Sequence, residues 1–256
     1  MLTGDQYPYR RIVSDLREQV LGGQRAPGDR LPSESELATI YHTSRPTVRR
    51  ALAVLRSEGL IVTGQGSGTF VRARPGIQIC VTGSNYRRHR ALGLPGFNAQ
   101  VLAQGQSPRQ DITQVARIGA PDFVAEKFDL DEGESVIVRR RVFLADDMPV
   151  ALTDSYYPAS LAADNAIEKP ERIKGGAHAL IEDPEGPIGR RIARSADDLT
   201  ARMPTPSEVQ LLRLPAGVPV VRVLRTIYDS EGQPVEVQDT IAAADRHRFR
   251  YEVNME

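Results

Sequence analysis

The sequence has a single cysteine, few lysines and no long apolar run. Cys80 alone cannot form an intramolecular disulfide or a thiolate metal site, and its ordinary role is that of a small buried side chain. No 18 consecutive apolar residues are present to cross a bilayer, and the N-terminal residues MLTGDQYPYRR do not resemble a signal peptide. We therefore expect a cytoplasmic protein of a reducing compartment that does not contact a membrane.

The usual signatures of catalysis are also missing. The four histidines show no HxxxH spacing and have no cysteine partner, so a metal site is not expected. No GxSxG motif is present, and the run GQGSGTF at residues 64–70 is typical of a hairpin turn rather than of a nucleophile elbow. The sequence therefore predicts a protein that is not an enzyme and that needs no cofactor.

Neither sign of charge dominates the chain as a whole, but the charges are unevenly distributed. The formal net charge is zero over 256 residues, whereas residues 1–75 hold eleven arginines and seven acidic residues, which gives +4 there and −4 in the remainder. A composition with 40% hydrophobic and 26% charged residues is globular, and the length suits two domains. We expect only the first domain to meet nucleic acid.

Residues 28–72 predict two short helices, a tight turn and a two-stranded wing. Ser33 is a natural N-cap and Glu36 can complete a capping box, which starts a helix over about 33–41. The apolar face expected for this helix consists of Leu37, Ile40 and Tyr41. A further helix over about 9–21 precedes the pair and is expected to support it.

The second helix of the pair begins after Ser44, with Pro46 in its first turn, and extends to about Glu58. Its apolar stripe consists of Val48, Leu52 and Leu55, and its cationic face consists of Arg45, Arg49 and Arg56, beside Thr47 and Arg50. A major groove admits an α-helix, and forked guanidinium groups match the O6 and N7 atoms of guanine. The first turns of this helix are therefore expected to face DNA.

The wing is predicted from the residues that follow. Gly59 ends the helix, residues 60–63 and 69–72 can pair as strands, and residues 64–68 form a glycine-rich turn. A basic helix face alone is more often a solvated surface, and a GxGxG run occurs in many hairpins. The capping box, the basic helix and the glycine wing in this order favour DNA binding.

These motifs resemble the winged-helix domain of the GntR family of bacterial transcription regulators. The resemblance lies in LPSESELA (31–38), SRPTVRRAL (44–52), LRSEGLI (55–61) and GQGSGTFV (64–71). It implies that the DNA contacts, with Arg50 of the cationic face added, are Ser33, Ser44, Arg45, Thr47, Arg49, Arg50 and Gly66. Many family members have arginine where this chain has Ser35, so a contact is lost and the usual operator core is in doubt.

The rest of the chain predicts an α+β domain that follows a linker. We expect a winged-helix domain over 1–75, a linker over 76–94 and a second domain over 95–256. A strand is expected over 111–120, and hairpins over 135–158 and 218–243, the second with Gly232 in its turn. Helices are expected over 120–130, 159–167, 177–183 and 205–214, and a strand followed by a turn over 188–199.

The second domain resembles the UTRA effector-binding domain of the HutC subfamily, an antiparallel sheet with flanking helices akin to chorismate lyase. The resemblance lies in RRRVFLADDMPVALTDSYYP (139–158) and in the run from 212 to 250. It implies a small-molecule pocket lined by Arg139, Arg141, Asp154, Tyr156 and Glu236. Alternation along a strand places Arg139 and Arg141 on one face, which suits a carboxylate or phosphate, and Arg140 on the other. Solvent-facing arginines are the alternative.

The sequence thus predicts a DNA-binding transcription regulator, most simply a repressor. We expect a homodimer that binds an inverted-repeat operator on double-stranded DNA and is released by a small-molecule effector, possibly an anionic one. The alternative is an effector-independent plasmid-control or architectural DNA-binding protein whose second domain only dimerises.

Overall fold

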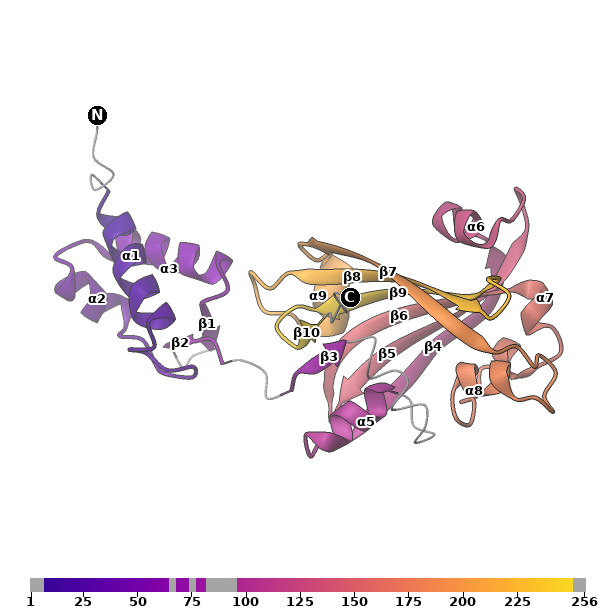
Figure 1. Ribbon diagram of the computed structural model, residues 1–256. Helices are drawn as coiled ribbons and strands as arrows, with labels where there is room; N and C mark the ends of the chain where they lie inside the picture. The colour runs from indigo at the N-terminus through magenta and orange to yellow at the C-terminus, as the bar shows by residue number, and fades with distance from the viewer. Residues whose placement is uncertain (1–6, 65–67, 74–76, 82–95, 251–256) are drawn as a thin grey trace, which may run out of the picture. The chain divides into compact units, whose positions relative to one another are not determined.

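The computed structural model describes residues 7–64, 68–73, 77–81 and 96–250. The chain divides into two compact units, one of Met1–Gly76 with Leu214–Val218 and one of Ile77–Arg213 with Pro219–Glu256 (Figure 1). Gly66 and most of the expected linker lie outside the described residues, and so does the side chain of Cys80.

The first unit contains three helices and a hairpin. Its elements are α1 (Pro8–Leu21), α2 (Glu34–Ile40), α3 (Arg45–Ser57), β1 (Ile61–Gly64) and β2 (Gly68–Val71). The strands of the hairpin are antiparallel, with Ile61 opposite Val71 and Thr63 opposite Thr69. The predicted winged helix is confirmed, and each element begins or ends within one or two residues of its expected bound.

The core of the first unit is formed by one face of each helix and by the inner side of the hairpin. The three apolar residues expected on the inner stripe of α3 are each at most 1% exposed, and Ile12 and Leu16 of α1 pack against them. On α2 only Leu37 is fully buried. Ile40, which we expected on the same apolar face, is 58% exposed, so that expectation was wrong. With seven residues, α2 presents less than two full turns to the core.

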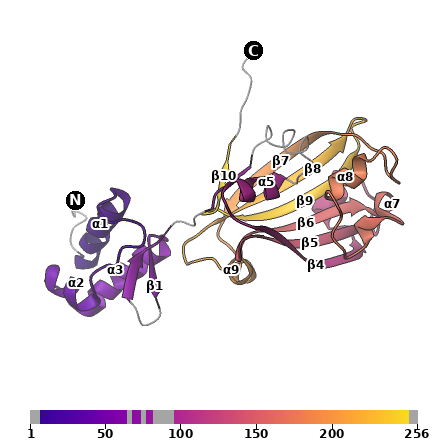
Figure 2. The same ribbon diagram turned by 90° about the horizontal axis from the view of Figure 1, so that it is seen from below.

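The second unit is built on a six-stranded antiparallel sheet (Figure 2). The strand order is β4-β5-β6-β9-β8-β7. The strands are β4 (Pro108–Gly119), β5 (Ser135–Ala145), β6 (Met148–Pro158), β7 (Ile192–Arg202), β8 (Val220–Asp229) and β9 (Pro234–Ala243). A short parallel pair is formed by β3 (Ile79–Val81) and β10 (His247–Phe249).

The two predicted hairpins are confirmed, and they pair with each other through β6 and β9. Asp146 and Gly232 have positive φ in the two turns, as tight hairpin turns require. Residues 188–199 were expected to end in a turn. Instead, β7 continues through Arg202 as a partner of β8. Asp197 and Asp198, at the end of that range, lie inside the strand.

Helices cover both faces of the sheet, each over a separate apolar cluster. The helical elements are α5 (Gly96–Ala103), α6 (Asp122–Phe128), α7 (Ala159–Ala162), η1 (Ala166–Glu168), α8 (Ala177–Glu182) and α9 (Pro206–Leu212). One cluster joins Tyr157 and Ile227 of the sheet to α7, η1 and α8. The other joins Val138 and Tyr156 to α6, so α6 lies on the opposite face (Figure 1).

Candidate functional site

A serine caps the start of each of the two helices α2 and α3. Ser44 is the N-cap of α3 and its Oγ accepts a hydrogen bond from the backbone N–H of Thr47, while the two hydroxyl groups lie 2.9 Å apart. Ser33 is the N-cap of α2 in a complete capping box with Glu36. The backbone N–H of Ser33 donates to the Glu36 carboxylate, and this contact lowers the pKa of Glu36. Both helix starts are thereby fixed from within the chain.

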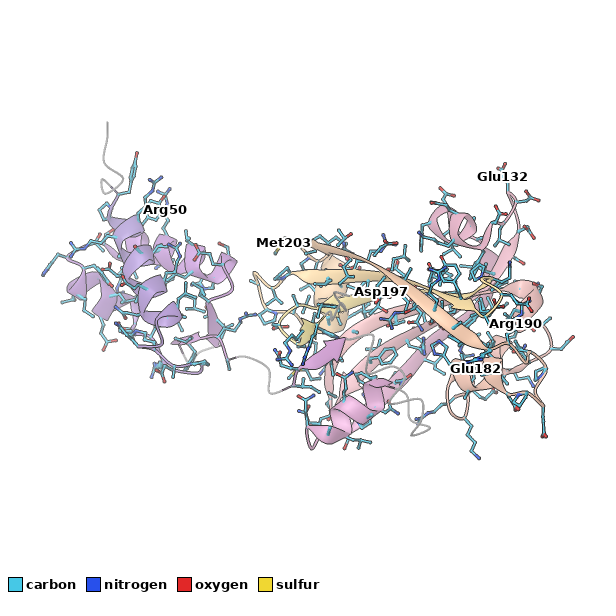
Figure 3. All side chains as sticks on the ribbon, in the orientation of Figure 1. Arg50, Glu132, Glu182, Arg190, Asp197 and Met203 are labelled. Carbon is cyan, nitrogen blue, oxygen red and sulfur yellow. The ribbon has the colours of Figure 1, made fainter. Side chains whose placement is uncertain are left out.

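The arginines of α3 leave the helix in two directions. Arg45 donates to Ser35 Oγ and Arg49 pairs with Glu34, so both lean toward the start of α2. Arg50, labelled in Figure 3, instead stacks on the ring of Tyr9. Its guanidinium carbon lies 4.0 Å from the ring centroid. The structure therefore brings Arg45 and Arg49 together and directs Arg50 toward α1.

The exposed cationic face of α3 and the hydroxyl groups at the two helix starts have the chemistry to bind DNA. Arg45 and Arg49 are exposed, and Ser33, Ser44 and Thr47 lie at the two helix starts beside them. Guanidinium groups recognise guanine or phosphate, and hydroxyl groups recognise phosphate. Of the seven residues expected at DNA, Gly66 lies outside the described part of the chain.

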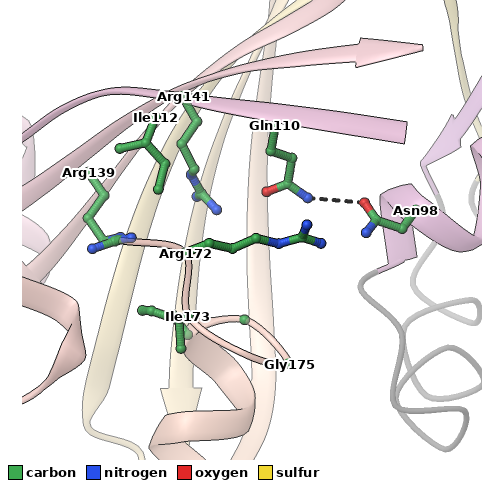
Figure 4. Close-up of a pocket in the computed structure, with 10 residues that line it drawn as sticks. Asn98, Gln110, Ile112, Arg139, Arg141, Arg172, Ile173 and Gly175 are labelled. Atoms are coloured by element: carbon green, nitrogen blue, oxygen red, sulfur yellow. Dashed lines mark hydrogen bonds between the residues drawn. The ribbon is translucent and has the colours of Figure 1, made fainter. Parts of the chain in front are cut away.

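A cavity of about 190 Å³ opens on one face of the second unit's sheet (Figure 4). It lies between β4 and β5, α5, and the loop that precedes α8. Arg141 and Gln110 point from the strands toward Arg172, which extends from that loop. The full lining consists of Asn98, Gln110, Ile112, Arg139, Arg141, Arg172, Ile173, Gly175, Gly176 and Ala177.

Arg139 lines this cavity, but its guanidinium group is hydrogen-bonded within the protein. It is 4% exposed and donates to four backbone carbonyls, those of Ala166, Ile167, Lys169 and Glu171, at 2.5–3.3 Å. Burial lowers its pKa. Because these carbonyls belong to η1 and the chain that leads to Arg172, Arg139 holds that loop against the sheet.

Arg141 and Arg172 are the cations with unused hydrogen-bond donors in this cavity. Arg141 Nη2 donates to Ser155 Oγ at 2.5 Å, while its buried Nε has no partner within the described residues. Arg172 is exposed and has no hydrogen-bond or ion-pair partner in the part of the chain that the structure describes. Two guanidinium groups facing one small cavity can bind an anion.

Glu236 lies on the same face of the sheet in a buried network, but it does not line the cavity. Its carboxylate accepts hydrogen bonds from Tyr157 Oη at 2.6 Å and Gln238 Nε2 at 2.9 Å, and lies 2.6 Å from His178 Nε2 of α8. Burial alone would raise the pKa of Glu236, but the His178 contact, the nearby Arg141 charge and the Tyr157 hydrogen bond outweigh it and hold the pKa at about 2. Glu236 therefore anchors α8 to the sheet and is not a free carboxylate.

Asp154 and Tyr156 lie on the opposite face of the sheet. Asp154 is paired in register with Arg140, whose Nε donates to it at 3.1 Å, and Tyr156 packs beneath α6. Burial, together with the nearby Asp154 charge, raises the pKa of Tyr156 to about 12. The five residues that we expected in one pocket are thus divided three to two between the faces. Arg139 and Arg141 line the cavity, whereas Asp154, Tyr156 and Glu236 do not.

Sequence reasoning missed three polar residues of the cavity. Arg172 follows Lys169 in a short basic segment just before Gly175, and that pattern was a usable signal. Asn98 and Gln110 carried no such signal. Asn98 is 8% exposed and its Oδ1 accepts from Gln110 Nε2 at 3.1 Å, so an amide pair lies at the end of the cavity near α5 (Figure 4).

Within ranges 7–64, 68–73, 77–81 and 96–250, no group of three or more His, Cys, Asp or Glu side chains is arranged to hold a metal ion. Among the described helices, none is long and apolar enough to cross a membrane.

Both units match known protein families. Residues 8–71 match the family described as bacterial regulatory proteins, gntR family, and residues 103–248 match the UTRA domain. The HTH-type transcriptional repressor NagR of Bacillus subtilis is 29% identical, with 94% of this chain and 92% of NagR covered. The mannosyl-D-glycerate transport/metabolism system repressor MngR of Escherichia coli is 27% identical, with 94% and 93% covered.

Solved structures show the same architecture. A crystal structure of a GntR-family transcriptional regulator superposes with a TM-score of 0.67 at 27% identity, covering 98% of this chain and 99% of that one. PhnF from Mycobacterium smegmatis superposes with a TM-score of 0.59 at 24% identity, covering 96% and 100%. The second similarity supports the fold alone.

Proposed function

This chain belongs to the GntR family of bacterial regulatory proteins and carries a UTRA domain, and from that premise we propose that it is a repressor released from its operator by an anionic small molecule. Its family and the relatives named above are DNA-binding transcription regulators rather than enzymes. Repression, the operator's symmetry and the effector are the parts that we propose for this chain.

The proposed DNA interface is the start of α3 together with the start of α2. The observation that carries it is the pair Arg45 and Arg49, exposed side by side on a helix whose opposite face is fully buried. The hydroxyls of Ser33, Ser44 and Thr47 supply phosphate contacts at the edges. Because Arg50 stacks on Tyr9, we expect it to contact a DNA phosphate rather than a base.

The proposed effector site is the cavity between Arg141 and Arg172. Their unused donors favour a carboxylate or phosphate, and the Asn98–Gln110 amide pair favours hydroxyl groups at the other end. One relative's name refers to mannosyl-D-glycerate, a sugar derivative that carries a carboxylate. We therefore assign the effector to small hydroxylated anions.

We propose a two-fold homodimer in which the effector changes the spacing of two recognition helices. A symmetric dimer of winged helices requires an inverted repeat with matching half-site spacing. The effector can release DNA only to the extent that it binds the DNA-free arrangement more tightly. The loop from Glu168 to Gly176 is the segment that we expect to differ between the two arrangements, because it carries Arg172 and leads directly into α8.

The test combines footprinting with a ligand screen on the full-length chain. Genomic fragments retained by the purified protein at a stated salt concentration should share an inverted repeat that is protected from nuclease, because phosphate contacts make affinity salt-dependent. Sugar acids and sugar phosphates should then be screened for a rise in melting temperature and for loss of that footprint. A footprint that no such anion weakens would support effector-independent DNA binding instead, and retention without a shared sequence would refute the operator.

A further inference from the structure

An ion pair joins the two helices at the centre of the proposed DNA interface. Arg49 of α3 pairs with Glu34, the first residue of α2: Arg49 Nε and Nη2 lie 3.3 and 3.2 Å from Glu34 Oε2. Both side chains reach solvent, with 64% of Arg49 and 36% of Glu34 exposed. The carboxylate therefore lies on the same surface that is proposed to meet DNA.

Glu34 does not occupy the edge of the Arg49 guanidinium group that can bind a base. A guanidinium has five N–H donors in one plane. Glu34 occupies the side edge, formed by Nε and one hydrogen of Nη2. The end edge, formed by Nη1 and the other hydrogen of Nη2, has the spacing that binds guanine O6 and N7 together. A carboxylate on the side edge fixes the plane in which the end edge points.

Folding accounts for only a small part of this contact. Exposed ion pairs contribute little to stability, because solvent screens the charges and two long side chains must be ordered. The N-terminal capping of α2 is supplied by Ser33 and Glu36 and does not need the Glu34 carboxylate. Glu34 in the first turn favours the helix by at most about 1 kcal/mol, and its contact also restricts the many rotamers of Arg49 before DNA is bound.

Within the residues that the structure describes, the neighbouring arginines have no comparable partner. Arg45 donates to the neutral hydroxyl of Ser35, and Arg50 stacks on Tyr9. A charge-assisted contact is stronger than a neutral one, so Glu34 is the acceptor that orients its arginine most firmly. A carboxylate so close to DNA phosphates also lowers affinity for DNA of any sequence.

We infer that Glu34 is a positioning residue that orients Arg49 to read one guanine in each operator half-site, at the expense of sequence-independent affinity. This inference rests on the proposed function, because it requires an operator. It assigns Glu34 to base selectivity and not to the strength of binding.

The test uses the full-length chain and measures selectivity at each base pair. Wild type first selects a consensus from random duplexes, and Arg49→Ala identifies the guanine that Arg49 reads. Glu34→Ala should lower the preference for guanine at that same position by roughly 5- to 100-fold, the range of one bidentate contact, while preference elsewhere is unchanged. Affinity for duplexes of unrelated sequence should rise at the same time.

Glu58→Ala is the matched control. Glu58 makes a similar exposed pair with Arg17 at 2.5 Å, 32% of its side chain is exposed, and its removal changes the charge of the unit equally. It should leave every base preference unchanged. Adding Glu34→Ala to Arg49→Ala should change selectivity no further, and thermal unfolding checks that each variant is folded.

The outcomes separate the positioning role of Glu34 from the proposed binding of an operator. If Arg49→Ala removes a guanine preference that Glu34→Ala and Glu34→Gln both retain, the positioning role is refuted. If Arg49→Ala changes no base preference, it is refuted as well, because Arg49 then reads no base. If wild type selects no consensus at all, the operator itself is refuted, which is the failure of the proposed function.

Discussion

Two arginines on the same face of β5 have different partners. Arg139 donates to four buried carbonyls, whereas Arg141 makes one hydrogen bond and has an unpaired Nε within the described residues. Arg139→Ala should lower the free energy of unfolding by about 2–4 kcal/mol, because it leaves carbonyls without donors. Arg141→Ala should cost less than about 1 kcal/mol and abolish stabilisation by the effector.

Urea unfolding, with and without the best anion from the screen, measures both effects. Arg140→Ala is the control, since Arg140 lies on the other face and pairs with Asp154. Equal destabilisation by the Arg139 and Arg141 variants would contradict the separation of roles. Retained stabilisation by the anion in Arg141→Ala would remove Arg141 from the effector site.

Glu236 predicts a specific dependence of stability on pH. Its pKa is lowered from 4.5 to about 2 in the folded chain, so its contribution is present above the unfolded value and is lost as the pH falls toward the folded value. Wild type should therefore lose about 3 kcal/mol more than Glu236→Gln between about pH 5 and pH 2. Denaturant unfolding across this range measures it, and parallel curves for the two proteins would contradict it.

Helix α2 depends on its cap because it is only seven residues long. Ser33→Ala removes the hydroxyl that accepts from the Glu36 N–H and should lower the stability of the first unit by about 1 kcal/mol. Ser35→Ala is the matched control inside the same helix, where alanine is the better helix former. Hydrogen exchange of amides in α2 distinguishes the two, and equal protection in both variants would contradict a capping role.

At the scale of elements, what could be predicted from the sequence was local. The starts of α2 and α3 follow from caps and proline, and the hairpins follow from alternation around Asp146 and Gly232. Ile40 was misplaced because a short helix turns few positions toward the core. Residues 188–199 were expected to end in a turn, but the Asp197 carboxylate there pairs with Arg225 of β8, a partner 28 residues away.

The candidate effector site was only partly predictable for the same physical reason. Alternation correctly separated Arg139 and Arg141 from Arg140. It could not show that Asp154 would pair in register with Arg140, since register between strands is a tertiary property. Alternation also could not show that Arg139 would donate its hydrogen bonds to the carbonyls of a loop about 30 residues later in the chain.

At the scale of the whole molecule, the proposed dimer predicts the geometry of the operator. Protected half-sites should be centred about 10–10.5 base pairs apart, or a multiple of this spacing, because both recognition helices approach one side of the duplex. Arg45→Ala should reduce affinity by about 1–3 kcal/mol if the residue reads a base. Sedimentation of the full-length chain and footprinting measure these properties, and a single unrepeated half-site would contradict the two-fold arrangement.

The order of the sheet leaves β4 and β7 as its outer strands. An outer strand has unpaired backbone groups along one side and can recruit strands from other molecules, which leads to aggregation. Charged side chains oppose such recruitment, and β7 carries Arg194, Asp197, Asp198 and Arg202 within eleven residues. Asp197 and Asp198 thus also help to prevent aggregation when the protein is made in excess of its binding sites.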